Sequence, residues 1–361
     1  MHERTVPETA RHPARPNQEV AMQLNKFNLA KMLGVALLAA FGSAQFATAQ
    51  EMTLRMLYPW DDATNSINYI AKSFAKKVTA ATDGRIKFTF SGPEVVPPGQ
   101  QFQPVSAGLF GMAMNAPSYI SGTTGVPFAF FALPANAEIW REKGYWDAAD
   151  QEFRRFNQKL VAFVSETDKE DAFHIVLSKP LGAGDKPLAG RKIRGNAFYA
   201  PMVAPLGGSL VNLPGGEIYT SLQSGVVDGA GWSVNGSATL KVQEVAKYMM
   251  RPTFGTLPTY VTMNLDRWNS LSQADKEMFL KLGREVEREA PAASAIDTEK
   301  ALKVMTEAGM SATTLSPELA KTVLAGAKKG LWEIARTSNK QSTAAVNALH
   351  KLAVKGGDAQ E

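Results

Sequence analysis

Hydrophobic and polar residues follow two periods along the first part of the chain. Residues 52–57 alternate between apolar and polar side chains, and so do residues 86–90, which predicts two strands. Between them, Ile67, Ile70, Phe74 and Val78 recur at three- and four-residue spacing, which predicts a helix that ends near residue 84. A strand, a helix and a strand in this order favour a parallel β-α-β unit.

The same alternation continues through the rest of the chain. Further strands are predicted at 108–114, 173–178, 190–195, 209–214, 226–232 and 259–268, and helices near 102–105 and at 200–208, 216–225 and 273–289. No long polar or proline-rich linker separates two sequential domains. We therefore expect an α/β fold with mixed sheets, in two lobes joined by crossing segments and a long helix.

The lobes follow from where the chain crosses between the two halves. Residues 50–175, with roughly 253–272, are expected to form lobe I. Residues 176–252 are expected to form lobe II, with C-terminal helices over roughly 273–361 that complete it and brace both lobes. The cleft between two such lobes is the usual place for a small ligand.

The first 49 residues read as a leader. A second methionine, Met22, opens a segment with two lysines, an apolar core at 32–41 and the small residues Ala47-Thr48-Ala49, which is typical of a cleaved secretory signal. We expect translation to start at Met22 and the mature protein to be periplasmic. The chain contains no cysteine, so we expect neither disulfides nor a lipid anchor on cysteine.

Charge and composition argue against several classes of function. The whole chain has a formal charge of +5, and the leader holds five basic and three acidic residues, which leaves +3. No basic run or basic–aromatic stripe accompanies this excess, so no nucleic-acid partner is expected. Only His174 and His350 follow the leader, which argues against a histidine-rich metal site and against most acid–base catalysis. No cofactor or metal is expected.

One stretch, Pro214 to Trp232, carries the strongest functional pattern. A helix with Glu217 in its first turn is followed by the stop Gly225, by two valines and by Gly229-Ala230-Gly231. In open α/β sheets, ligands bind beyond the carboxyl ends of strands, where small residues leave space. The tryptophan that follows would form a wall of such a site.

This stretch and its neighbours resemble a known family. The pattern P-x-x-E-x-Y-x-x-L-Q-x-G-x-V-D-G over 214–229 is similar to the signature of TRAP-transporter solute-binding proteins of the DctP type. The segments 188–195 (LAGRKIRG), 262–279 and 74–88 resemble further segments of that family. The resemblance covers nearly all of the chain after the leader. It implies a two-lobed periplasmic binding protein that closes on a small organic acid and delivers it to the membrane subunits of a TRAP transporter, driven by an ion gradient.

The resemblance also implies which residues bind. The family's anchoring arginine falls on Arg194, whose guanidinium can hold a carboxylate by two parallel hydrogen bonds. Trp232 stands where many relatives that bind dicarboxylates carry asparagine, and Phe173 or His174 stands where many carry a second arginine. The chain is closer to the branch that binds 2-oxo acids, although Gly231 replaces a glutamate that some of that branch use towards a metal.

Weaker candidates come from strand ends. Tyr58 and Trp60 follow the first strand, Asn115 ends an apolar strand, and Asn196 follows the anchoring arginine. These positions resemble ligand-facing loops of the family, although an aromatic side chain after a strand is commonly part of the core. The aromatic residues together favour a flat or partly apolar monocarboxylate over a small polar diacid.

Two other functions use the same residues. Ser233, in Gly231-Trp232-Ser233-Val234-Asn235, nearly matches the nucleophile elbow of an α/β hydrolase, with His350 downstream, but the second glycine is missing. If Ser233 is not a nucleophile, it is a serine beside a binding pocket. A receptor that serves a sensor kinase would have the same fold and site, and a homodimer through the C-terminal helices stays open.

Overall fold

The structure is a computed structural model in which residues 51–61 and 68–361 are described. The expected leader, its start at Met22 and Ile67 lie outside these residues.

The first sheet has five strands in the order β2-β1-β3-β10-β4. Their bounds are Ile86–Ser91, Met52–Leu57, Met112–Asn115, Pro258–Asn264 and Gln158–Ser165, in the same order. β1 is parallel to β2 and β3, whereas β10 is antiparallel to β3 and β4. Helix α2, Tyr69–Ala81, connects β1 to β2 and buries Ile70, Phe74 and Val78, as the spacing predicts.

The second sheet has six strands in the order β11-β9-β5-β8-β6-β7. Their bounds are Ser311–Thr314, Tyr248–Arg251, Phe173–Leu177, Gly229–Ser233, Lys192–Arg194 and Ser209–Val211. β8 is parallel to β6 and antiparallel to β5, so both sheets are mixed, as expected. The lobe boundary expected at residue 175 falls inside β5, which belongs wholly to this second sheet.

The predicted strand 226–232 is wrong at its start. Val226 is 52% exposed, and β8 begins only at Gly229. A Cβ at Gly229 would lie 2.7 Å from the carbonyl oxygen of Val176 on β5. The glycines are therefore part of the strand and allow the close approach of its neighbours.

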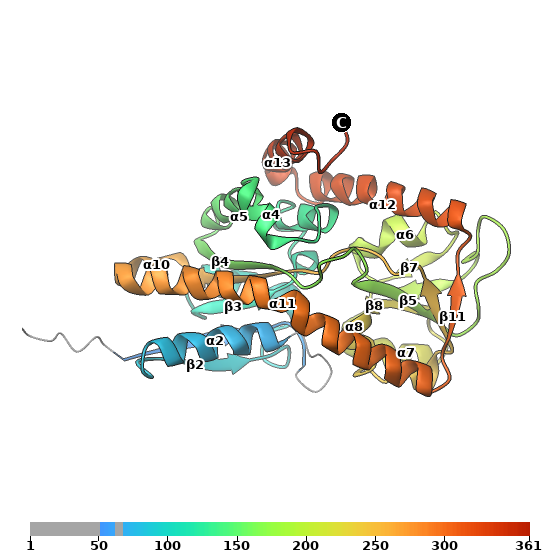
Figure 1. The fold of residues 1–361 in the computed structure, drawn as a ribbon, viewed down its shortest axis with the longest axis horizontal. Coiled ribbons are helices and arrows are strands. Elements are labelled where there is room, and N and C mark those ends of the chain that lie inside the picture. The colour runs from blue at the N-terminus through green and yellow to red at the C-terminus, as the bar shows by residue number, and fades with distance from the viewer. Residues whose placement is uncertain (1–50, 62–67) are drawn as a thin grey trace, which may run out of the picture. The chain divides into compact units, whose positions relative to one another are not determined.

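Long helices connect the two sheets (Figure 1). Helix α11 runs from Gln273 to Glu307, beyond the predicted end at 289 and through Pro291, and packs on β4, on α2 and on α8 (Val234–Ser237). Helix α12, Pro317–Thr337, packs on the 3-10 helix η4 (Pro127–Ala132) and on α6 (Ala200–Val203). Each helix thus contacts segments associated with both sheets, which is the bracing expected from the sequence.

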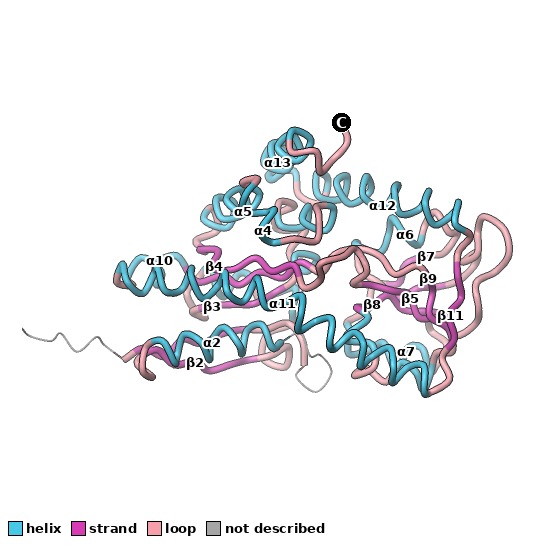
Figure 2. The backbone as a smooth tube through the Cα atoms, viewed as in Figure 1, coloured by secondary structure: helices cyan, strands magenta, loops and turns pink. Residues whose placement is uncertain are grey.

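The remaining helices are short, except for α5 and α13, and lie mostly beside the strands (Figure 2). They are α3 (Phe102–Ser106), α4 (Ala137–Glu142), α5 (Tyr145–Arg154), α7 (Ile218–Gln223), α9 (Val242–Val245), α10 (Leu265–Ser270) and α13 (Thr343–Lys355). Helix α13 packs on α5 and α12.

A buried carboxylate holds α11 against the first sheet. Glu287 is 3% exposed and accepts two hydrogen bonds from Arg141, at 2.6 and 2.8 Å. It also accepts from the backbone nitrogen of Phe163 at 2.7 Å and from Trp146 Nε1 at 3.2 Å. Burial raises the pKa of Glu287, and these donors oppose that rise.

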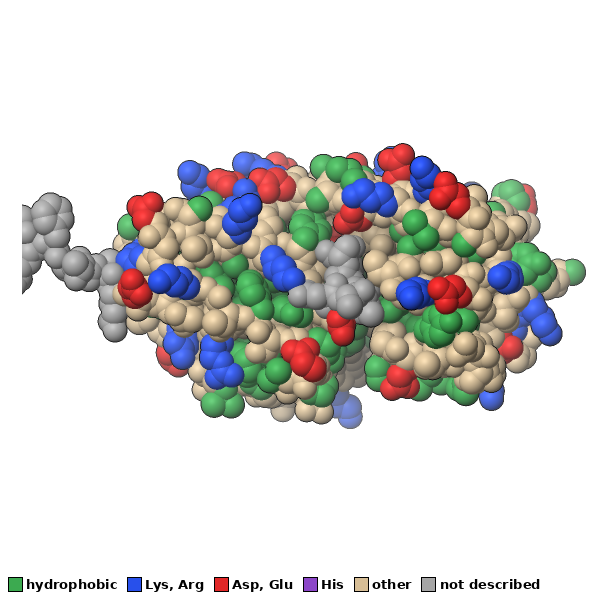
Figure 3. Space-filling model, turned by 90° about the horizontal axis from the view of Figure 1, so that it is seen from below, with side chains coloured by type: hydrophobic (Ala, Val, Ile, Leu, Met, Phe, Trp, Pro, Cys, Tyr) green, Lys and Arg blue, Asp and Glu red, His purple; other side chains and the backbone are tan. Residues whose placement is uncertain are grey.

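The surface carries charges of both signs. On the face shown in Figure 3, Lys and Arg side chains lie among Asp and Glu side chains without a continuous area of either sign. In the described part of the chain, no helix combines the length and apolar character that crossing a membrane requires.

Candidate functional site

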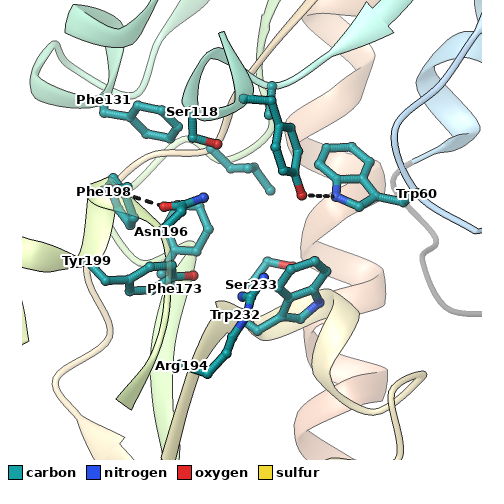
Figure 4. A pocket seen from close by; sticks show the side chains of 13 residues that line it. Trp60, Ser118, Phe131, Phe173, Arg194, Asn196, Phe198, Tyr199, Trp232 and Ser233 are labelled. Carbon is teal, nitrogen blue, oxygen red and sulfur yellow. Dashed lines mark hydrogen bonds between the residues drawn. The ribbon is translucent and has the colours of Figure 1, made fainter. Parts of the chain in front are cut away.

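A small cavity lies between segments associated with the two sheets (Figure 4). Its volume is about 40 Å³. The lining residues are mostly aromatic, with a few polar groups: Trp60, Ala116, Ser118, Tyr119, Phe131, Phe173, Arg194, Asn196, Phe198, Tyr199, Trp232, Ser233 and Leu257. We call this space the Arg194 cavity. Four of the seven residues proposed from the sequence line it directly on the second-sheet side, and Trp60 lines it from the other side.

Arg194 ends β6 and is 3% exposed. Its Nε donates to the carbonyl oxygen of Leu213 at 2.9 Å, and its Nη1 donates to that of Gly231 at 3.1 Å. Burial lowers the pKa of Arg194, but a guanidinium remains charged in proteins. Within residues 51–61 and 68–361, no carboxylate forms an ion pair with it. The two carbonyls fix the guanidinium, and Glu217 acts on its charge without forming an ion pair with it.

Trp232 covers this guanidinium. The Arg194 Cζ lies 5.1 Å from the centre of the Trp232 ring, in a cation–π arrangement. A Cβ at Gly215 would lie 2.6 Å from Trp232 Cη2, so the loop before α7 can lie on the ring only because residue 215 is glycine. This contact explains one of the bare glycines in the 214–232 stretch.

Two polar atoms beside Trp232 have no partner. Trp232 Nε1 and Ser233 Oγ are buried and make no hydrogen bond to the described residues. A Cβ at Gly236 would lie 2.7 Å from the first atom and 2.9 Å from the second, so both lie over this glycine. Buried polar atoms normally find partners. Both residues line the Arg194 cavity, and the two unpartnered atoms lie beside Gly236 of α8.

Tyr119 and Trp60 form the opposite wall. Trp60 Nε1 donates to the Tyr119 hydroxyl at 3.1 Å, and the two rings lie 6.3 Å apart. Burial raises the pKa of Tyr119, although the charge of Arg194 opposes the rise. The phenol is therefore neutral and keeps a proton to donate into the cavity.

Tyr199 lies on the glycines of β8. A Cβ at Gly231 would lie 2.3 Å from Tyr199 Cε1, so the absence of a side chain at residue 231 makes room for this ring. Burial raises the pKa of Tyr199 well above its usual range, which keeps the hydroxyl neutral. Asn196 accepts from the backbone nitrogen of Phe198 at 3.1 Å, and its amide nitrogen points into the cavity (Figure 4).

Two residues proposed from the sequence lie elsewhere. Asn115 is buried, and its amide nitrogen donates to the Pro98 carbonyl at 3.0 Å and to Gln101 Oε1 at 3.1 Å. Its side chain supports the loop after β2 and does not line the Arg194 cavity. Tyr58 also lies outside the lining and packs on Phe90 with ring centres 6.0 Å apart. Asn115 is thus bonded to the Pro98 carbonyl and to Gln101, and Tyr58 is a partly buried ring packed against the core. A role of either residue in ligand binding stays a prediction.

Sequence reasoning missed Tyr119, Tyr199, Phe131, Phe198 and Ser118. Four of these residues lie in 3-10 helices just after a strand. Ser118 and Tyr119 lie in η3 (Pro117–Tyr119), three and four residues after the end of β3. The same holds for Phe198 and Tyr199, which follow β6 in η5 (Ala197–Tyr199). The sequence carries one signal for these residues, a turn-forming residue just after each strand: Pro117 after β3 and the capping Asn196 after β6.

The residues do not form a hydrolase site at Ser233. His174 Nε2 lies 2.7 Å from Ser237 Oγ, which itself donates to the Ser233 carbonyl. Burial lowers the pKa of His174 to about 3. His350 is on α13, where its ring packs against Trp332 at 4.7 Å. In the described residues, no group of three His, Cys, Asp or Glu side chains is placed to hold a metal ion.

A family model supports the resemblance drawn from the sequence. Residues 59–336 match the family described as bacterial extracellular solute-binding protein, family 7. A solute-binding protein of Albidiferax ferrireducens is 25% identical over 282 residues, covering 73% of this chain and 80% of the relative. A monocarboxylate 2-oxoacid-binding periplasmic protein of Nostoc is 29% identical over 221 residues, covering 58% of this chain and 59% of that protein.

Solved structures share the fold. A TRAP periplasmic solute-binding protein of Desulfovibrio salexigens with bound orotic acid has a TM-score of 0.72 at 20% identity, covering 84% of this chain and 99% of its own. A TRAP periplasmic solute-binding protein of Rhodoferax ferrireducens with bound malonate has a TM-score of 0.70 at 19% identity. The match covers 85% of this chain and 100% of the other chain. The two-lobed α/β architecture expected from the sequence is confirmed.

Proposed function

Because the chain belongs to family 7 of the bacterial extracellular solute-binding proteins, we propose that it is a periplasmic receptor for a small monocarboxylate. It would deliver this acid to the membrane subunits of a TRAP-type transporter. The family consists of solute-binding proteins, so the hydrolase alternative has no support. The sensor-kinase receptor and the homodimer remain predictions, as does cleavage of the leader after Ala49.

One observation carries the proposal: Arg194 is a buried cation, and no carboxylate of residues 51–61 and 68–361 forms an ion pair with it. Burying an unpaired charge is strongly unfavourable, so such a site is completed by an anion. Nε and Nη1 are already engaged with backbone carbonyls, which fixes the orientation of the remaining N–H groups. A carboxylate in the Arg194 cavity would complete the pair by charge-assisted hydrogen bonds.

The other lining residues support a monocarboxylate. Tyr119 and Tyr199 are neutral donors, and Trp232 Nε1 and Ser233 Oγ make no hydrogen bond within the described part of the chain. These groups suit the carboxylate and one further oxygen, such as a 2-oxo or 2-hydroxy group. Among the described residues, Arg194 is the one arginine that lines the cavity, and Phe173 or His174 stands where the resemblance places a second arginine, so a second carboxylate would find no cationic partner there.

Binding would couple to closure of two lobes. We assign β1–β4 and β10 to one lobe and β5–β9 and β11 to the other, which moves the boundary from 175 to between β4 and β5. The Arg194 cavity takes Trp60 and Tyr119 from the first lobe and Arg194 and Trp232 from the second. A ligand that contacts both walls favours the closed state.

The test is calorimetric titration of the chain after residue 49 with pyruvate, lactate, propionate and malonate. We expect a 2-oxo or 2-hydroxy monocarboxylate to bind, and Arg194→Ala to weaken it by about 2–5 kcal/mol because a buried charge pair is broken. Arg194→Lys should recover only part of this loss, since lysine lacks the planar fork. Arg267→Ala is the control: Arg267 is exposed on α10 and outside the lining. Binding that survives Arg194→Ala would overturn the carboxylate anchor.

A further inference from the structure

A second, much larger cavity lies behind the Arg194 cavity. Its volume is about 720 Å³, within the range of ordinary ligand pockets of roughly 300–1,000 Å³. It lies between α12, the 253–257 crossing segment and the segments that carry Phe131 and Phe198. We call it the rear cavity.

Phe131 and Phe198 line both cavities. Their ring centres are 4.6 Å apart, and each is less than 5% exposed. Phe173 continues this wall on the side of the Arg194 cavity, 4.5 Å from Phe198, and Phe254 continues it on the side of the rear cavity, 6.1 Å from Phe198. We call these four rings the phenylalanine partition. Figure 4 shows Phe131 and Phe198 at one end of the Arg194 cavity, away from Trp60.

The partition is made by both lobes. Phe131 lies in η4, where the neighbouring Phe130 stacks on Phe163 of β4 at 4.1 Å. Phe198 lies in η5, directly after β6. The contact between Phe131 and Phe198 therefore forms only when the lobes are together, and it separates the two spaces in the closed form.

The Arg194 cavity is much smaller than the rear cavity, about 40 Å³ against about 720 Å³. A long tail would therefore have to extend beyond the Arg194 cavity. The rings of the partition make no side-chain hydrogen bonds, so they can rotate without leaving a polar group unpaired. A ligand tail that replaces their mutual contact would still lie against apolar side chains.

The rear cavity suits such a tail near the partition. Met202, Phe254, Leu324, Leu331 and Trp332 provide an apolar lining. Its rim reaches water at the ion pair between Lys328 and Glu170, whose side chains are 47% and 43% exposed. Further charged side chains, Lys329, Arg336, Asp358 and Glu361, also line this cavity. The apolar lining includes Phe254 of the partition itself.

We propose that the rear cavity is a second compartment of the binding site, which holds the apolar tail of a monocarboxylate whose head is on Arg194. Phe131 and Phe198 determine which tail lengths are accepted. The proposal rests on the carboxylate function proposed above and extends the ligand class to acids with an alkyl or aryl tail.

The test uses a series of acids with the chain after residue 49: propionate, hexanoate, octanoate and 4-phenylbutyrate, titrated by calorimetry. Ala327→Phe places a ring in the rear cavity from α12, outside the Arg194 cavity. We expect it to weaken octanoate and 4-phenylbutyrate at least tenfold and propionate less than twofold. The control on the same helix is Gly326→Ala, where an added Cβ meets nothing within 4 Å.

A second variant opens the partition. Phe131→Leu shortens the wall and should strengthen octanoate at least threefold relative to propionate, by making room between the cavities. The proposal is overturned if propionate binds through Arg194 while the longer acids do not bind, or if Ala327→Phe leaves the longer acids unaffected. If no acid binds to any variant, the carboxylate function itself is wrong and this proposal falls with it.

Discussion

Gly231 offers the sharpest test of how the glycine-rich strand shapes the binding site. It lies in the middle of β8, its carbonyl accepts from Arg194, and Tyr199 covers its Cα. In Gly231→Ala, the new Cβ would lie 2.3, 2.5 and 2.8 Å from three atoms of the Tyr199 ring. Carbon atoms in good contact are about 3.5–4.0 Å apart, so the ring or the strand must move by roughly 1 Å.

The surroundings of Tyr199 resist this movement. Its ring packs edge-on against Phe198 at 5.0 Å, Phe173 at 5.8 Å and Phe254 at 6.1 Å. Overpacking of a filled core typically costs about 1–3 kcal/mol. At roughly 2–4 °C in the unfolding midpoint for each kcal/mol, we expect a fall of about 2–12 °C.

Binding should suffer as well as stability. A displaced Tyr199 ring would enter the Arg194 cavity, or β8 would shift and carry away the Gly231 carbonyl that orients Arg194. We expect at least tenfold weaker binding of the acid that binds best to the unmodified protein. Thermal unfolding and calorimetric titration measure the two effects separately.

Gly216→Ala is the matched control in the same stretch. An added Cβ there meets nothing within 4 Å, so we expect an unchanged or slightly raised midpoint and unchanged affinity. If Gly231→Ala unfolds and binds like the unmodified protein, Tyr199 does not lie on β8 and the steric account of the glycines is wrong. Equal losses in both variants would point instead to a general effect of replacing glycine.

Two further predictions concern buried carboxyl groups. Glu287→Ala removes the carboxylate that accepts from Arg141 and leaves that guanidinium without its partner. The free energy of unfolding, measured by denaturant titration, should fall by about 3–5 kcal/mol. Glu138 forms more exposed ion pairs with Arg284 and Arg288, so Glu138→Gln should lower the free energy of unfolding by less than about 1 kcal/mol. Equal losses in the two variants would contradict the argument that burial decides the cost. Glu166 is fully buried beside Thr259, and burial raises its pKa well above 4.5. The folded protein therefore favours the protonated form of Glu166. The stability gained from this protonation is complete below about pH 4.5 and is lost as the pH rises towards the raised pKa. Glu166→Gln should match the unmodified protein at pH 4.5 and become progressively more stable than it at higher pH, by up to about 1.4 kcal/mol per unit; a constant difference across pH 4.5–8 would refute the assignment.

The sequence was most informative where a single period governed a segment. In α2 the three- and four-residue spacing was enough to identify the buried face, because one side of that helix packs on a sheet. β4 buries all eight of its residues and therefore shows no alternation, and it was not predicted. β11 was missed for the opposite reason: it is an edge strand of Ser-Ala-Thr-Thr, mostly exposed, with no apolar pattern.

The same reasoning explains which parts of the candidate site could be predicted. Arg194, Trp232 and Ser233 end two neighbouring strands of one sheet, so strand order and local motif place them together. Tyr119 and Phe131 reach the cavity from the other lobe, through 3-10 helices whose direction is not set by the strand before them.

The packing of one lobe against the other thus supplies the part of the site that local patterns do not encode. Asn115 illustrates the difference, because a polar residue at a strand end needs a partner but does not reveal which one. Its amide nitrogen donates to the Pro98 carbonyl and to Gln101, whereas Tyr119, which lines the cavity, lies four residues further along the chain. Sequence therefore places most of the wall that carries the anchoring charge. On the facing wall it proposed Trp60 but not Tyr119 or Phe131, whose positions depend on how the lobes pack.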